Sequence, residues 1–145
     1  MKDSMAHGKF DGPALKLHAE DIQKLRKIGV HWRVDGEGPS VVLVWLQGHI
    51  NSHTPDQCKV ELKDGNFVVT INKCQNIPGG NTWITTGLYV MVIGEVDSTD
   101  GSINAVKIAD LTTTTNTNTI HKQTWMMEVT EAKAVVTENP HLFFP

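Results

Sequence analysis

The histidines are the residues of this chain whose type and spacing come nearest to a metal site. His49 and His53 stand four residues apart, the spacing that places two imidazoles on one face of a helix. His49 falls at the end of an apolar run typical of a strand, and His53 lies close to Pro55 in a polar stretch. The two would not share a helix face, and no third ligand is in register. We interpret both as loop histidines, not as a zinc pair.

Pro78-Gly79-Gly80 is a second segment that superficially resembles a binding motif. A phosphate-binding loop needs a downstream Gly-Lys-Ser/Thr and opens a helix, and neither feature follows here. The sequence also lacks a Gly-x-Ser-x-Gly elbow and a His-Glu-x-x-His pair, and its carboxylates are scattered. We therefore predict a protein that is not an enzyme and holds no cofactor and no metal.

The composition favours a mainly β domain with an unexceptional surface charge. The 145 residues include 13 Lys+Arg and 16 Asp+Glu, for a net charge of -3. Val, Ile and Thr number 15, 10 and 15, against 7 Ala and 9 Leu. β-Branched side chains suit a pleated surface. The acidic balance argues against a strongly basic surface for nucleic acid.

The cysteines and the apolar runs point to an intracellular protein. Cys58 and Cys74 stand alone, so we predict two reduced thiols, with a single disulfide as the alternative. The N-terminal residues contain no apolar leader, and no run approaches the ~18 residues of a membrane span. We expect no membrane partner.

The spacing of apolar residues predicts the helices and strands that would position any functional residues. Residues 15–28 have apolar positions at spacings of four and three, which predicts a helix ending at Gly29, or a partly extended stretch. A Thr/Asn-rich tether at 112–119 precedes a second helical pattern at 120–136. Five strands are expected between these helices, at 41–50, 58–63, 66–72, 88–96 and 103–111.

Two turn signals refine the arrangement of these strands. Gly48 within the first strand indicates a bend that lets one strand serve two sheets. Asp64-Gly65 predicts a type I′ hairpin turn. Five strands, a long connection after the third, and a helical segment at each end favour a five-stranded OB-fold barrel, with an α+β meander as the competitor. The domain would span 15–137, between tails at 1–14 and 138–145.

Single-stranded DNA binding is the rival function for such a barrel, because OB folds often hold DNA on basic grooves with stacking aromatics. This chain has only two Arg and nine aromatic residues. Trp45 and Phe67 lie in apolar runs that predict core packing, whereas Tyr89 and Trp83 are freer.

The terminal helical pattern is the most informative feature. Trp125, Met126 and Met127 are consecutive, so at ~100° per residue they cover ~200° of the helix surface. Val129 and Ala132 extend the Trp125 side. A helix apolar on more than one side is usually buried against two things, and Trp and Met are enriched at interfaces. We expect a partner chain here. The alternative is a helix tucked wholly into its own barrel.

Several segments together resemble the RecQ-mediated genome instability protein 2 family. They match in order and spacing over roughly residues 15–131: Leu15-Lys16-Leu17-His18-Ala19-Glu20, Val44-Trp45-Leu46-Gln47-Gly48, the run 87–94, the run 105–111, Ile120-His121 and Trp125-Met126-Met127-Glu128-Val129. The resemblance implies a non-catalytic nuclear OB-fold subunit that pairs with the C-terminal OB fold of RecQ-mediated genome instability protein 1. That pair joins a Bloom-type RecQ helicase and topoisomerase III alpha, which together dissolve double Holliday junctions.

The resemblance also implies which residues bind partners. Lys107 and Trp125 would line a groove for a peptide of a Fanconi anaemia M-type translocase. Lys16 and its neighbour Leu17 would lie near the heterodimer interface, although Lys16 could also sit on a solvated helix face. Met126 and Val129 would complete the partner-binding side of the terminal helix. No direct contact with nucleic acid is expected, and a stand-alone single-stranded DNA-binding protein remains the alternative.

Overall fold

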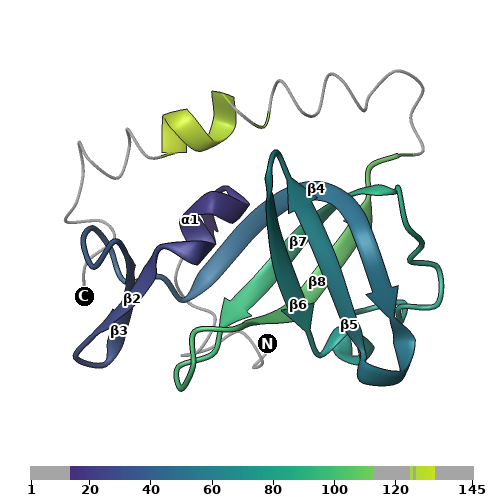
Figure 1. Cartoon of the computed structure of the whole chain (residues 1–145), viewed down its shortest axis with the longest axis horizontal. Coiled ribbons are helices and arrows are strands. Elements are labelled where there is room, and N and C mark those ends of the chain that lie inside the picture. Colours follow the sequence, from purple (N-terminus) through teal and green to yellow (C-terminus); the bar gives the residue numbers. More distant parts are fainter. Residues whose placement is uncertain (1–13, 113–124, 126, 133–145) are drawn as a thin grey trace, which may run out of the picture.

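The strands of the barrel form where apolar side chains alternate with polar ones, and they enclose a single core (Figure 1). The computed structural model describes residues 14–112, 125 and 127–132. Its elements are β1 (Leu15–Lys16), α1 (Ala19–Gln23), β2 (Leu25–Ile28), β3 (His31–Val34), β4 (Leu43–Thr54), the 3-10 turn η2 (Pro55–Gln57), β5 (Lys59–Asp64), β6 (Phe67–Asn72), the 3-10 turn η3 (Cys74–Asn76), β7 (Tyr89–Val96) and β8 (Ile103–Asp110). Helix follows at 125 and 127–132, here called the terminal helix.

The main sheet closes on itself and confirms the predicted five-stranded barrel. Its strand order is β1-β4-β5-β6-β8-β7, and β4 also pairs with β7, so no long edge is left open. The β6–β8 pair is parallel, through Ile71 and Ile103, whereas β4–β5, β5–β6, β7–β8 and β4–β7 are antiparallel. A long connection between β6 and β7 makes this crossover, which is the Greek-key arrangement of an OB fold.

Strand β4 pairs with both β7 and β5, as the bend expected at Gly48 predicted. It pairs with β7 from Leu43 to His49 and with β5 from His49 to Thr54, with a register shift between Ile50 and Ser52. A Cβ built on Gly48 would lie 2.3 Å from the backbone oxygen of Lys63. The glycine is therefore needed because the β5 backbone passes too close for any side chain.

The β5–β6 hairpin is confirmed, but its predicted turn type is wrong. Asp64 pairs with Phe67, so the two central residues are Gly65 and Asn66. Among these two, only Gly65 has a positive φ, of +64°. That pattern is typical of a type II′ turn, which needs glycine at the first central position, and not of type I′.

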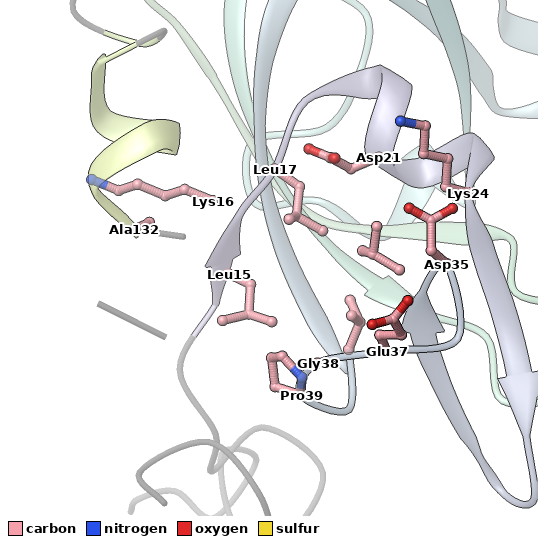
Figure 2. A pocket seen from close by; sticks show the side chains of 12 residues that line it. Leu15, Lys16, Leu17, Asp21, Lys24, Asp35, Glu37, Gly38, Pro39 and Ala132 are labelled. Atoms are coloured by element: carbon pink, nitrogen blue, oxygen red, sulfur yellow. The ribbon is translucent and has the colours of Figure 1, made fainter. Parts of the chain in front are cut away.

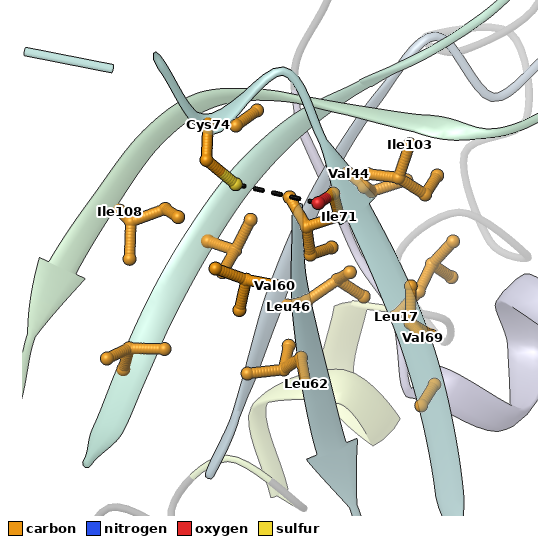
Figure 3. Close-up of a cluster of buried hydrophobic side chains, with 14 of the residues drawn as sticks. Leu17, Val44, Leu46, Val60, Leu62, Val69, Ile71, Cys74, Ile103 and Ile108 are labelled. Carbon is orange, nitrogen blue, oxygen red and sulfur yellow. Dashed lines mark hydrogen bonds between the residues drawn. The ribbon is translucent and has the colours of Figure 1, made fainter. Parts of the chain in front are cut away.

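The core lies inside the barrel and draws on every long strand (Figure 3). Inward positions alternate along β5 and β6, as expected, with Val60, Leu62, Val69 and Ile71 at most 4% exposed. Phe67 packs against this cluster from its edge. The segment after β6 also contributes to the core, through Cys74, Ile77 and Ile84.

The helix predicted over residues 15–28 is wrong for most of its length, and the partly extended alternative is correct. Only Ala19–Gln23 is helical. Leu15 and Lys16 pair in parallel with Val44 and Trp45 of β4, and Leu25–Ile28 forms a hairpin with β3. Strand pairing overrides the helical spacing because β4 and β3 supply backbone partners that local periodicity does not reveal.

The β2–β3 hairpin, which periodicity missed, is held against the barrel by Trp32. Its indole Nε1 donates to the backbone oxygen of Ser98 at 3.2 Å. A Cβ on Gly101 would lie 2.7 Å from the same ring, so the β7–β8 turn is shaped to receive it. The loop expected at 35–39 follows this hairpin.

Some sequence predictions fall outside the described residues. These are the tails at 1–13 and 138–145, the tether at 113–119, and Met126. The helix predicted over 120–136 is helical where it is described, at 125 and 127–132.

Candidate partner interface

The terminal helix lies across the outer side of the barrel and is anchored by two buried side chains (Figure 1). Trp125 and Val129 are each 1% exposed. The Trp125 indole stacks on Trp45 of β4, with ring centroids 6.4 Å apart and planes at 27°. Aromatic pairs in this range add roughly 0.5–1.5 kcal/mol beyond the area they bury. Trp45 thus points out of the barrel, so its predicted place in the core is wrong.

A second aromatic contact links the helix to the start of α1. The His18 ring meets Trp125 edge-on, with centroids 6.2 Å apart and planes at 85°. His18 Nδ1 lies 2.9 Å from Asp64 Oδ2, which also accepts a bond from the backbone N–H of Ala19 at 3.3 Å. The turn of the β5–β6 hairpin therefore fixes His18, and His18 fixes one edge of Trp125.

Lys16 lies beside the terminal helix on β1, not on a solvated helix face. Its Nζ is 2.8 Å from Glu128 Oε1 and 4.8 Å from the centroid of the Trp45 ring. The two paired side chains are 29% and 32% exposed, so the ion pair is worth at most about 1 kcal/mol. Its main effect is to set the position of the helix on the barrel.

Lys107 projects from the outer face of the barrel in line with Trp45. Trp45 pairs with Ile93 of β7, and Ile93 pairs with Lys107 of β8, which makes one row across three strands. Adjacent strands lie about 4.8 Å apart, so Trp45 and Lys107 are separated by roughly 10 Å at the backbone. Lys107 is exposed, while Trp45 and Ile93 are half-buried. We call these three residues the outer row.

Three of the six predicted site residues are buried by this chain itself. One lies in the barrel core, and two lie between the terminal helix and the barrel. Leu17 is 5% exposed within the core cluster, so most of its side chain supports the barrel. Trp125 and Val129 hold the terminal helix to β4. Met127 is 63% exposed, so the described part of the helix leaves one large apolar side chain facing away from the barrel.

Two indole nitrogens at this site lack acceptors among the described residues. Trp45 Nε1 and Trp125 Nε1 are both buried there without a hydrogen-bond partner. A buried donor without an acceptor costs roughly 1–3 kcal/mol. The stacked tryptophans therefore contribute through their ring faces and not through their N–H groups.

A groove borders the C-terminal end of the described part of the terminal helix (Figure 2). Its volume is about 380 Å³, and Ala132 of the helix stands at its rim. Leu15 and Leu17 point toward Pro39 across an apolar floor, whereas Asp35 and Glu37 stand on the side of the β2–β3 hairpin.

The described residues offer no cluster that suggests metal binding. They contain no cluster of three or more His, Cys, Asp or Glu that could hold an ion. His49 packs edge-on against Tyr89, with centroids 5.0 Å apart, and His53 Nδ1 lies 3.0 Å from the backbone oxygen of Ile84. None of the helices in the described part of the chain has the length and apolarity to span a membrane.

Tyr89 is buried, so the prediction that its ring is free of the core is wrong. It is 2% exposed, and its hydroxyl donates to Gln47 Oε1 at 3.3 Å. Burial, followed by the charges of Asp64 and Glu128, raises the pKa of the hydroxyl above its usual range. Trp83 is half-buried against the core. The Tyr89 ring is therefore not available to stack a nucleic-acid base.

Sequence reasoning missed His18, Asp64 and Trp45 as parts of the site. A capping box links His18 to Asp21, so the spacing of three residues marks the start of α1. Nothing local indicated that Asp64 would reach His18 across 46 positions. The outward direction of Trp45 was also hidden, because β4 is apolar on both faces.

Solved structures of other proteins share this fold. The chain aligns with a structure of the S. pombe Stn1–Ten1 complex at a TM-score of 0.56 and 14% identity, covering 83% of this chain and 96% of that one. A chain from a replication protein A heterotrimer bound to single-stranded DNA aligns at a TM-score of 0.61 and 14% identity, covering 85% and 94%. At this identity the likeness concerns the fold, and both neighbours support the OB-fold assignment.

Sequence similarity to known proteins shows the family as well as the fold. The chain is 29% identical to RecQ-mediated genome instability protein 2 of Gallus gallus over 138 residues, covering 89% of this chain and 98% of the relative. It is 30% identical to the Mus musculus protein of the same name over 125 residues, covering 81% and 80%. The family model for RecQ-mediated genome instability protein 2 matches residues 13–133. With its OB barrel and its terminal helix packed on β4, this chain belongs to the RecQ-mediated genome instability protein 2 family.

Proposed function

We propose that this chain is a non-catalytic subunit that pairs with the C-terminal OB fold of RecQ-mediated genome instability protein 1. Through that partner it joins a Bloom-type RecQ helicase and topoisomerase III alpha, in a nuclear complex that dissolves double Holliday junctions. Family membership and the OB fold support this role. The absence of catalytic motifs in the sequence agrees with it.

Met127 on the terminal helix is the observation that carries the proposal. Trp125 and Val129 dock one side of the helix, and Met127 remains 63% exposed on another side. Methionine is enriched at protein interfaces, and its unbranched side chain adapts to a partner's surface. The helix is therefore held rigidly by its own barrel while it offers apolar surface to a second chain.

The outer row supplies a charged edge for the same surface. Lys107 is exposed next to the half-buried Ile93, which places an ammonium group beside apolar area. An arrangement of this kind suits a peptide with an apolar anchor and an acidic or carbonyl group. We assign the proposed peptide of a Fanconi anaemia M-type translocase to this row.

The surface of β5 favours a protein ligand over single-stranded DNA. Lys59, Glu61 and Lys63 alternate with inward-facing residues, so the outer face carries both signs of charge. A single-strand site combines a basic groove with exposed aromatic rings. Tyr89 is buried and cannot serve as such a ring.

The proposal is tested by co-expressing this chain with the C-terminal OB fold of RecQ-mediated genome instability protein 1 and measuring the affinity of the purified pair. Met127→Asp should weaken binding at least about 10-fold, because a charge would be buried in apolar contacts. Val30→Asp is the matched control, since Val30 is 77% exposed on the distant β2–β3 hairpin. Its affinity should equal that of the unaltered chain.

Lys107→Glu, with Lys59→Glu as its control, tests the outer row separately by titration of the pair with the translocase peptide. Only the Lys107 variant should lose affinity. Failure of the two OB folds to co-purify refutes the proposal. A tight, steeply salt-dependent complex between the isolated chain and a labelled oligonucleotide, measured by fluorescence anisotropy, would favour the DNA-binding alternative.

A further inference from the structure

Cys58 and Cys74 meet at the open end of the β5–β6 hairpin. Cys58 directly precedes β5, and Cys74 opens η3 directly after β6 and Lys73. The backbone N–H of Cys74 donates to the backbone oxygen of Cys58 at 2.9 Å. Both are free cysteines; Cys74 is buried, and Cys58 is partly exposed.

The backbone contact limits the distance between the two residues. With ordinary bond lengths, an N···O distance of 2.9 Å allows the two Cα atoms to be at most about 6.8 Å apart. Disulfides join Cα atoms roughly 4.4–6.8 Å apart. The separation between Cys58 and Cys74 is therefore no greater than the longest that a disulfide spans.

The sulfur of Cys74 is directed at the neighbouring strand. Its Sγ donates to the backbone oxygen of Ile71 at 3.5 Å, a contact drawn in Figure 3. The backbone N–H of Val60 lies close enough to the same sulfur to lower the pKa of the thiol. Val60 and Ile71 are paired across β5 and β6, so the sulfur lies over this pair, two residues along the chain from Cys58.

The backbone at this place is also unusual. Cys58 has a φ of +55° and Lys73 a φ of +58°, and only one other non-glycine residue in the described part of the chain, Asp35, has a positive φ. Aspartate adopts this conformation with little penalty, whereas cysteine and lysine seldom do. The fold therefore holds Cys58, and the residue directly before Cys74, in strained backbone conformations.

We propose that Cys58 and Cys74 are a modification site that forms an intramolecular disulfide by exchange with oxidised glutathione. The Cys58 thiolate attacks one sulfur of oxidised glutathione, forms a mixed disulfide and releases one glutathione thiolate. Cys74 then loses its proton to solvent, and its thiolate attacks Cys58 Sγ and releases the second glutathione. The protein dithiol is oxidised by two electrons, and one oxidised glutathione is reduced to two glutathione molecules.

The order of the two steps follows from accessibility. Cys58 is the partly exposed partner, so it meets glutathione first. Burial raises the pKa of the Cys74 thiol to about 11, and the nearby Cys58 adds to this effect. The second step is therefore slow at neutral pH, and its rate should rise about tenfold for each pH unit up to the pKa.

The bond would close a loop of about 15 residues around the β5–β6 hairpin. Cross-links of this length stabilise proteins by restricting the unfolded chain. The thermal midpoint of the oxidised chain should lie on the order of 10 °C above that of the reduced chain. The Cys58→Ser, Cys74→Ser double variant should show no such rise.

The full chain, incubated with oxidised glutathione at about pH 8 and then alkylated, is analysed by intact mass and peptide mapping. We expect loss of two hydrogen atoms and a cross-linked peptide joining Cys58 to Cys74. Cys74→Ser should stop at the glutathione adduct on Cys58, and Cys58→Ser should leave Cys74 unmodified. A glutathione adduct on the unaltered chain that persists at about pH 9, or a disulfide between two copies, overturns the proposal.

Discussion

Replacing Trp125 by alanine tests whether the terminal helix is docked on the barrel as a separate element. Trp125 is 1% exposed and contacts Trp45 and His18. Truncating a fully buried tryptophan costs about 3–5 kcal/mol. The described contacts that remain are Val129, worth about 1.5–3 kcal/mol, and the Lys16–Glu128 ion pair, worth at most about 1 kcal/mol.

The variant should therefore lose the docked helix and keep the barrel. Amide hydrogen exchange followed by mass spectrometry measures both parts in one experiment. A loss of about 3–5 kcal/mol corresponds to roughly 10²- to 5 × 10³-fold faster exchange in peptides spanning 125–132. Peptides from β5 and β6 should exchange as in the unaltered chain, because their side chains pack inside the barrel.

Met127→Ala is the control for this experiment. Met127 lies on the same helix and is 63% exposed. Its truncation should therefore change the free energy of opening of the helix, measured by exchange, by less than about 0.5 kcal/mol. Unchanged protection of 125–132 in Trp125→Ala would refute the anchoring role. Equal loss of protection in β5 and β6 would refute separate docking, because helix and barrel would then unfold as one unit.

Three further outcomes follow from contacts elsewhere. Gly48→Ala should lower the free energy of unfolding by at least about 1–3 kcal/mol in urea denaturation, since its Cβ would meet the Lys63 backbone oxygen at 2.3 Å; an unchanged midpoint would contradict the close approach. Lys16→Gln should cost no more than about 1 kcal/mol, and the difference should shrink in high salt, because the pair with Glu128 is partly exposed. The pKa of Cys74 is raised by burial from 9.0 to about 11. The contribution of the neutral thiol to the stability of the folded chain is therefore fully present below pH 9 and is lost as pH rises through 11. The unaltered chain should lose more stability than Cys74→Ala over this window, and parallel pH profiles of the two would contradict the assignment.

The sequence was most informative where burial and periodicity agree. Strand β5 alternates between charged and apolar residues from Lys59 to Lys63, and its strand assignment and facing were both correct. The stretch 15–28 misled, because two short strands and one helical turn reproduce the four-three spacing of a helix. Deciding between them requires the partner strand β4, which begins fifteen residues after 28 in the chain.

Of the candidate site, sequence could indicate the components and not their directions. The adjacent Trp125, Met126 and Met127 predicted a helix with apolar side chains on more than one side. Which of them would face the barrel depends on Trp45, and β4 is apolar on both faces. Only the stacking geometry reveals that Trp125 faces inward and Met127 outward.

By itself, the sequence determined the class of protein: β-branched strands, turn residues and an ordered set of motifs specify a barrel of this family, because these signals are local. Tertiary structure alone decided how the surface is divided. It buried Leu17, placed Lys107 in line with Trp45, and brought Cys58 to Cys74. Those relations depend on strand register and closure of the barrel, which join residues far apart in the chain and leave no mark in local sequence.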